Sequence, residues 1–214
     1  MNRLLLIISL WCFALCASAR EYADTAIYQG TSVKLDIAMP ILEVARSAGK
    51  IQSYEVAANV RLAKRFYPTV EAGYALAECG ADGGYHKGHG GFGRLGMDLA
   101  VIKKGETENN MLIGLRLGGA YQHYDLTNVK IHSTYWGEVR HNFYDQQRFD
   151  CWGEFVAGSQ VQIYKGFQMG WYIRMKLLFT RNAKEGSVMP YYIPGLGFRK
   201  DFNWGFNYYL AYKF

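Results

Sequence analysis

Cysteine and proline are scarce in this chain of 214 residues, which has four of each. Cys12 and Cys16 lie in an apolar leader, so Cys79 and Cys151 alone remain and a disulfide framework is excluded. Beyond the leader the chain also lacks a long apolar run, because glycines or charges interrupt each one, and this excludes a helical membrane protein. Lysines and arginines are scattered singly despite a net charge of +6, which argues against a nucleic-acid partner.

The beginning of the chain has the features of a secretory signal peptide. A positively charged start is followed by an apolar core that is shorter than the ~20 residues of a membrane-spanning helix. The small residues Ala17 and Ala19 then form a cleavage site. We therefore predict an exported protein with a signal peptide at 1–19, a periplasmic lead-in at 20–32 and one domain at 33–214.

Between residues 204 and 214 every second side chain is aromatic or apolar. One face carries Phe206, Tyr208, Leu210, Tyr212 and Phe214, and the other face is mostly polar. Because successive side chains of a strand point to opposite faces, this period of two predicts an amphipathic strand. A terminal strand of this kind resembles the assembly signal of bacterial outer-membrane barrels. The resemblance implies that the barrel assembly machinery reads this strand and that it closes the barrel against the first strand.

The same alternation recurs along the chain and predicts further strands. It is clear in 33–39, 54–62, 70–77, 94–101, 111–122, 149–164 and 167–179, and weaker in 130–138 and 191–199. With the last strand this makes about ten strands, or eight if the two weak segments do not count. Ten strands would place the tight Lys165-Gly166 turn at the end opposite the termini, whereas barrels usually keep short turns on the periplasmic side. The glycine-rich stretch 78–91 is expected to be a mobile surface loop.

Charged residues are confined to one face of these strands. Six of them are expected to form a network in the lumen: Arg94, Asp98, Arg116, Glu154, Arg174 and Lys176. A soluble β-barrel would place its charges outside, and a strand protein in a membrane must close on itself to pair its backbone groups. The pattern predicts an all-β, closed antiparallel up-and-down transmembrane β-barrel with a lumen filled by side chains. Its partners would be outer-membrane lipid and lipopolysaccharide, and aromatic residues at strand ends, Tyr67 and Phe92 among them, would face the membrane interfaces.

Several segments resemble a known family. They are FGRLGMDLAVI (92–102), IGLRLGGAYQHY (113–124), Tyr135-Trp136-Gly137, the hairpin at 151–176 and the segment 193–197. These are similar to segments of a family of small, uncharacterised outer-membrane β-barrel proteins from Bacteroidota. The resemblance implies a barrel in the outer membrane of a Gram-negative bacterium. It implies no activity, cofactor or functional residue.

Four histidines are expected near the extracellular rim. They are His86, His89, His123 and His132. With nearby carboxylates they could bind a divalent metal ion, or with Ser133 they could hydrolyse an ester of lipopolysaccharide. No motif supports either use, and solvated loop histidines are the simpler interpretation. We expect a structural or surface-interacting barrel without catalytic residues or a cofactor. The alternatives are a lipid-modifying or metal-binding barrel and a narrow pore.

Overall fold

The structure is a computed structural model that describes residues 28–37, 50–62, 65–81, 84–101, 109–133, 137–180 and 188–214. The signal peptide expected at 1–19 lies outside these residues. The first strand begins at Tyr28, earlier than the predicted start at Val33, so the end of the expected lead-in belongs to the wall. Within the described part, no helix is long and apolar enough to cross a membrane.

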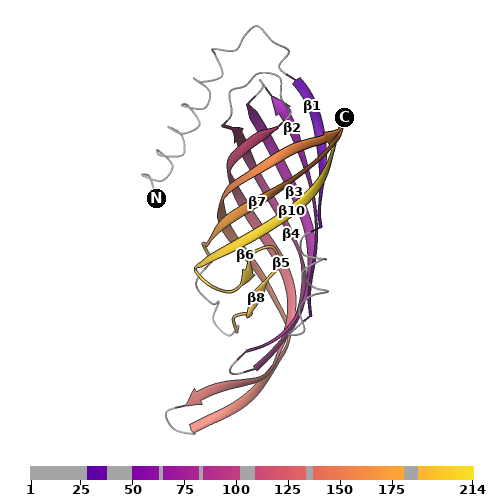
Figure 1. The fold of residues 1–214 in the computed structure, drawn as a ribbon. Coiled ribbons are helices and arrows are strands. Elements are labelled where there is room, and N and C mark those ends of the chain that lie inside the picture. The colour runs from indigo at the N-terminus through magenta and orange to yellow at the C-terminus, as the bar shows by residue number, and fades with distance from the viewer. Residues whose placement is uncertain are drawn as a thin grey trace, which may run out of the picture.

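Eight antiparallel strands form a closed barrel (Figure 1). They are β1 (Tyr28–Asp36), β2 (Lys50–Leu62), β3 (Phe66–Ala81), β4 (Gly84–Ala100), β5 (Asn110–Ser133), β6 (Gly137–Tyr164), β7 (Phe167–Leu178) and β10 (Phe202–Lys213). The order around the ring is β1-β10-β7-β6-β5-β4-β3-β2, which is the predicted up-and-down arrangement. The last strand pairs with the first, from Ser32↔Lys213 to Asp36↔Tyr209, so the predicted closing strand is confirmed in that position.

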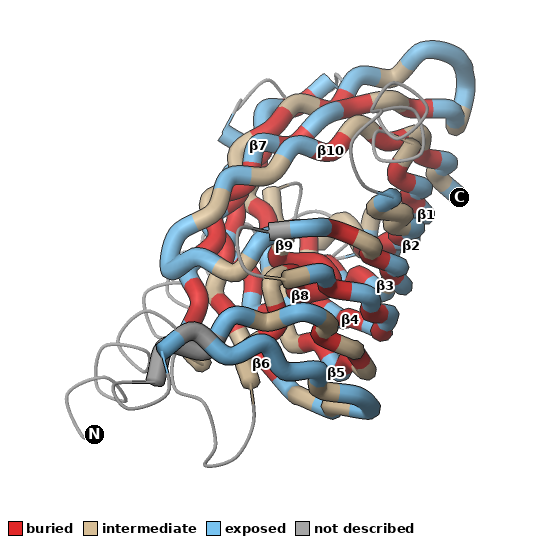
Figure 2. The backbone as a smooth tube through the Cα atoms, turned by 90° about the horizontal axis from the view of Figure 1, so that it is seen from below, coloured by how far each residue is buried: buried red, intermediate tan, exposed pale blue. Residues whose placement is uncertain are grey.

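The prediction of about ten barrel strands was wrong, and the alternative of eight is correct. Of the segment 130–138, residues 130–133 and 137–138 belong to the far ends of β5 and β6, whose pairing continues beyond the barrel. Residues 191–199 form β8 (Tyr192–Ile193) and β9 (Gly197–Phe198), which pair with each other. These strands are short because Gly195, at φ +76°, turns the chain back at once. Figure 2 shows this hairpin within the ring of strands.

Eight strands also change the end at which the tight turn lies. Lys213 donates its backbone N–H to the carbonyl oxygen of Gly166 at 2.8 Å. The Lys165-Gly166 turn is therefore at the same end as the last strand's terminus. The long β3–β4 and β5–β6 hairpins extend from the other end (Figure 1).

In the glycine-rich stretch 78–91, residues 78–81 and 84–91 are regular strand and not the mobile loop that the composition predicts. β3 continues to Ala81 and β4 begins at Gly84. Inward glycines of this stretch are needed for space: a Cβ on Gly90 would lie 2.4 Å from the carbonyl oxygen of Tyr121, and one on Gly88 would lie 2.9 Å from Cβ of Tyr124, whereas one on Gly80 would have nothing within 4 Å. Glycines in a sequence usually weaken or interrupt a strand, but here the crowded barrel interior requires them within β4.

The wall is apolar outside and charged inside. Leu95 and Leu117 are cross-strand neighbours that are 64% and 66% exposed, whereas Arg94 is 3% exposed. The change of colour from residue to residue in Figure 2 follows this alternation. Two predicted interface aromatics were placed on the wrong side, because Tyr67 and Phe92 are buried in the lumen at 4% and 6% exposure.

Candidate functional site

Arg174 of β7 lies at the centre of the lumen and binds three carboxylates. Its Nη1 is 2.8 Å from Oε2 of Glu71 and 3.0 Å from Oε2 of Glu154. Its Nη2 is 3.2 Å from Oε1 of Glu55. These carboxylates come from β3, β6 and β2, because inward side chains of an eight-stranded barrel converge on its axis. One guanidinium therefore connects four strands.

Two further arginines share these carboxylates. Nη1 of Arg94 lies 2.9 Å from Oε2 of Glu71, and its Nε lies 2.8 Å from Oε1 of Glu154. Arg116 pairs with Glu71 and places Nη2 2.8 Å from Oδ2 of Asp98. Glu71 thus accepts from three guanidinium groups, which are suited to such contacts by their planar set of donors.

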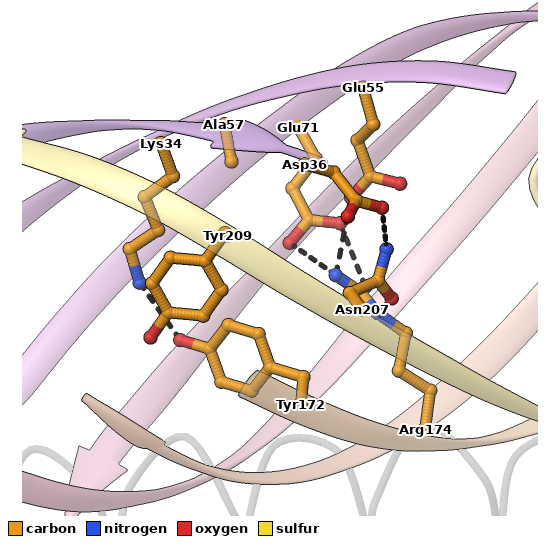
Figure 3. A pocket seen from close by; sticks show the side chains of 9 residues that line it. All are labelled: Lys34, Asp36, Glu55, Ala57, Glu71, Tyr172, Arg174, Asn207 and Tyr209. Carbon is orange, nitrogen blue, oxygen red and sulfur yellow. Dashed lines mark hydrogen bonds and ion pairs between the residues drawn. The ribbon is translucent and has the colours of Figure 1, made fainter. Parts of the chain in front are cut away.

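A chain of hydrogen bonds leads from this network to Lys34, and Figure 3 shows its last bond, between Tyr172 and Lys34. Nζ of Lys34 donates to the hydroxyl of Tyr172 at 2.9 Å, and that hydroxyl donates to Oδ2 of Asp98 at 3.0 Å. Nζ of Lys34 also lies 4.6 Å from the ring centre of Tyr209, within the range of a cation–π interaction. The ammonium of Lys34 and the hydroxyl of Tyr172 therefore both have partners.

We call the ten buried ionisable residues of this region the central charge cluster. It contains five cations and five anions: Lys34, Arg94, Arg116, Arg174 and Lys176, and Asp36, Glu55, Glu71, Asp98 and Glu154. The balance is required because an unpaired charge in such a place costs several kcal/mol. All six residues predicted for the lumen network belong to it. The other four lie at inward positions that the alternation also indicates, but alternation does not show which side chains share one level of the barrel.

The cluster leaves almost no free volume. A cavity between Lys34, Glu71, Tyr172 and Arg174 measures about 10 Å³, which is room for about one water molecule. Figure 3 shows the side chains that line it. This space is too small for a substrate.

The β8–β9 hairpin occupies the lumen on the side of the cluster that faces the long hairpins (Figure 1). We call residues 192–198 the plug. The carbonyl oxygen of Gly195 accepts from Nη2 of Arg94 at 2.8 Å and from Nζ of Lys176 at 2.7 Å. Ile193 and Leu196 are 0% and 2% exposed and belong to an apolar cluster with wall residues such as Trp152. The sequence predicts this segment as a short wall strand. Its apolar residues are compatible both with the apolar outer face of a wall strand and with a plug buried in the lumen.

A second ion cluster on β6 contacts Thr180, which precedes the plug in the chain, and Arg199, which follows it directly. Asp150, which is 0% exposed, accepts from Oγ1 of Thr180 at 2.8 Å and lies 3.2 Å from Nη1 of Arg199. Arg148 of the same strand places its Nε 2.9 Å from this carboxylate. These contacts hold the chain before and after the plug.

The histidines do not form one group. His86 is buried in the lumen and lies 5.7 Å from the ring of Tyr124, whereas His89 points outward, because positions three apart in a strand face opposite sides. His123 lies on the outer face beside His89. His132 is in β5, and its side chain is outside the described part. Among the described residues no three histidines, cysteines, aspartates or glutamates come together as metal ligands.

The row predicted as an assembly signal lies along the outer face of β10. Phe206 and Tyr212 are 50% and 51% exposed, and the rings of Tyr212 and Phe214 meet edge to face at 4.9 Å. Asn207 and Tyr209, on the opposite face, are buried. The two faces of this strand are therefore those that the alternation indicates.

Comparison with known proteins adds a family but no activity. No curated protein matches the chain. The model of a domain of unknown function, DUF6048, matches residues 1–214, which is the whole length of the chain. The chain therefore belongs to the DUF6048 family.

Proposed function

We propose that this chain is an outer-membrane β-barrel that holds its long hairpins at the cell surface and closes its lumen with its own side chains. The observation that carries the proposal is the inverted polarity of the wall. Leu95, Leu115 and Leu117 are exposed at 64%, 52% and 66%, while ten charges are buried inside. In water this arrangement is unfavourable, because each Å² of exposed apolar surface costs about 25 cal/mol.

Aromatic side chains on the outer face support this placement. Tyr74, Tyr121 and Phe149 lie in one row across β3, β5 and β6, and are 45%, 50% and 58% exposed. Further toward the hairpins the outer face becomes polar, where Nζ of Lys87 lies 3.1 Å from Oε1 of Glu78. Aromatic girdles mark the interfaces of membrane barrels, so we propose this row as the outer interface.

The orientation follows from the ends of the strands. Short turns of outer-membrane barrels lie in the periplasm, which would put both termini there and the long hairpins outside. β5 pairs with β4 as far as Tyr85↔Thr127, but its pairing with β6 continues to Ser133↔Gly137. We propose this extension as the surface that meets other molecules. Export by the signal peptide expected at 1–19, in an envelope like that of Bacteroidota, fits this arrangement.

A transport or catalytic role has less support. A narrow pore needs a continuous passage, and the central charge cluster leaves a cavity of about 10 Å³. An enzyme needs a site that admits substrate. His86 is 0% exposed and lies in the lumen, whereas His89 lies on the outer face, so the two imidazoles do not share such a site. We therefore propose a non-enzymatic, non-conducting barrel without a cofactor.

Assembly of the barrel is proposed to depend on the outward row of β10. Replacing Phe206 and Tyr212 together by serine should lower the yield of folded barrel. Replacing Tyr144, an equally exposed aromatic of the β5–β6 hairpin, should not. Equal yields from both variants would contradict a role of this row in assembly.

Three measurements test the location. After expression with its leader, the protein should be recovered in the outer-membrane fraction, and its mobility in detergent gels should change on boiling. Protease added to intact cells should cut within the β5–β6 hairpin. Recovery in the soluble periplasm with the same mobility before and after boiling would contradict the proposal.

A further inference from the structure

Two histidines stand side by side on the outer face of the barrel. His89 of β4 and His123 of β5 are direct cross-strand partners. Their ring centroids are 5.7 Å apart, and the ring planes are inclined by 8°. No hydrogen bond joins either imidazole to another residue in the described part of the chain. Both rings therefore keep their nitrogen atoms available.

Neighbouring aromatic residues restrict the two rings. Tyr121 meets His123 edge to face at 5.3 Å, and its hydroxyl is fixed by donation to Oε1 of Gln147 at 2.6 Å. Tyr74 lies 6.3 Å from His89. Holding one ion between both rings requires the imidazoles to turn out of the stacked arrangement, so these contacts set the starting position of the pair and not its metal-bound geometry.

The position of the pair makes it accessible from water under the proposed orientation. In the register of the sheet, His89 and His123 lie one row beyond the aromatic row of Tyr74 and Tyr121, on the side of the hairpins. The next row outward contains Lys87 opposite Asp125, which is a polar surface. An ion in solution can thus reach the imidazoles without crossing the lumen.

We infer that His89 and His123 form an open two-histidine site for a late first-row divalent metal ion, with Cu²⁺ bound most tightly. Metal–imidazole bonds are about 2 Å long, so two nitrogens on one ion lie at most about 4 Å apart. Rings with centroids at 5.7 Å reach that separation through side-chain rotation. Imidazole suits copper, nickel and zinc and not magnesium or calcium, and affinity rises toward copper along the series. Water completes the coordination.

The test uses the full, untagged chain refolded in detergent micelles and titrated with Cu²⁺. Wild-type protein should bind one equivalent, and its electron paramagnetic resonance spectrum should show coupling to two imidazole nitrogens. His89→Gln and His123→Gln should each lower the affinity at least tenfold. His141→Gln is the matched control, because His141 is also exposed on a strand but lies opposite Val129 and contacts Phe143, and it should leave the affinity unchanged.

A second measurement needs no variant. Diethyl pyrocarbonate modifies free imidazole, and Cu²⁺ should protect His89 and His123 of the wild-type chain together while His141 stays reactive. The inference is overturned if wild type binds no Cu²⁺, if His89→Gln binds as tightly as wild type, or if protection falls on other histidines. Because the site is on the outer face, these outcomes are independent of whether the barrel is found in the outer membrane.

Discussion

Arg174 and Glu71 form an ion pair of 2.8 Å between strands on opposite sides of the barrel. In the ring order, β7 and β3 are separated by three strands in either direction. The pair therefore crosses the lumen. Three of the ten charges in the central charge cluster, Arg94, Arg116 and Arg174, contact Glu71, so the loss of Glu71 should affect the whole cluster.

Glu71→Gln should destabilise the barrel strongly. It leaves three arginines with one fewer negative charge in a buried place, and breaking such a pair typically costs about 3–5 kcal/mol. Unfolding by urea in lipid vesicles measures the difference. Glu78→Gln is the control on the same strand, because its ion pair with Lys87 is exposed and should contribute nothing measurable. Equal midpoints for both variants would show that the cluster does not stabilise the barrel.

Gly118→Ala should lower stability by overpacking. The added Cβ would lie 2.4 Å from Cε2 of Trp152, whose Nε1 is held by donation to Oε1 of Glu154 at 2.6 Å. Extra carbon atoms in a filled interior cost about 1–3 kcal/mol. Gly80→Ala has nothing within 4 Å and should stay within about 0.5 kcal/mol of wild type. Thermal unfolding of both variants gives the comparison, and a stable Gly118→Ala protein would mean that the indole can move.

Leu117→Lys tests whether the outer face meets hydrocarbon. Leu117 is 66% exposed and lies between Leu95 and Gly153 in the register of the wall. A lysine on the lipid face of a membrane barrel costs about 2–4 kcal/mol at the midplane. Val139→Lys, in the β5–β6 hairpin beyond the barrel, should have no effect. If Leu117→Lys folds into vesicles as stably as wild type, this face does not lie in the membrane.

Replacing the plug, residues 192–198, by a short Gly-Ser linker should not open a channel. The central charge cluster still fills the lumen between the plug and the end of the barrel that holds the C-terminus, where the cavity measures about 10 Å³. Planar bilayers with the variant should therefore show no conductance steps, as with wild type. The variant should also unfold more easily, since Ile193 and Leu196 lose their burial against the wall. Conductance steps would identify the plug as the barrier to ions.

Much of the wall is predictable from the sequence because alternation is a local property. The period of two in segments such as 94–101 and 111–122 depends on consecutive residues alone, and each inward or outward position there agrees with the structure. The six residues assigned to the lumen network lie in the central charge cluster for the same reason. The same alternation separates the outward leucines from the inward arginines between them.

Other features depend on distant parts of the chain. The glycine-rich composition of 78–91 predicts a loop, but Gly88 and Gly90 are required there by the close approach of Tyr124 and of the backbone carbonyl of Tyr121 on the neighbouring strand. Likewise, an apolar segment at 191–199 is suited to a wall or to a plug, and the turn at Gly195 with its contacts to Arg94 decides for the plug. The sequence by itself thus determined two faces, one apolar and one charged. The tertiary structure decided the number of wall strands, the position of the plug in the lumen and the partners of each buried charge. These depend on residues far apart in the chain, because only the closed barrel brings β3 and β7 face to face.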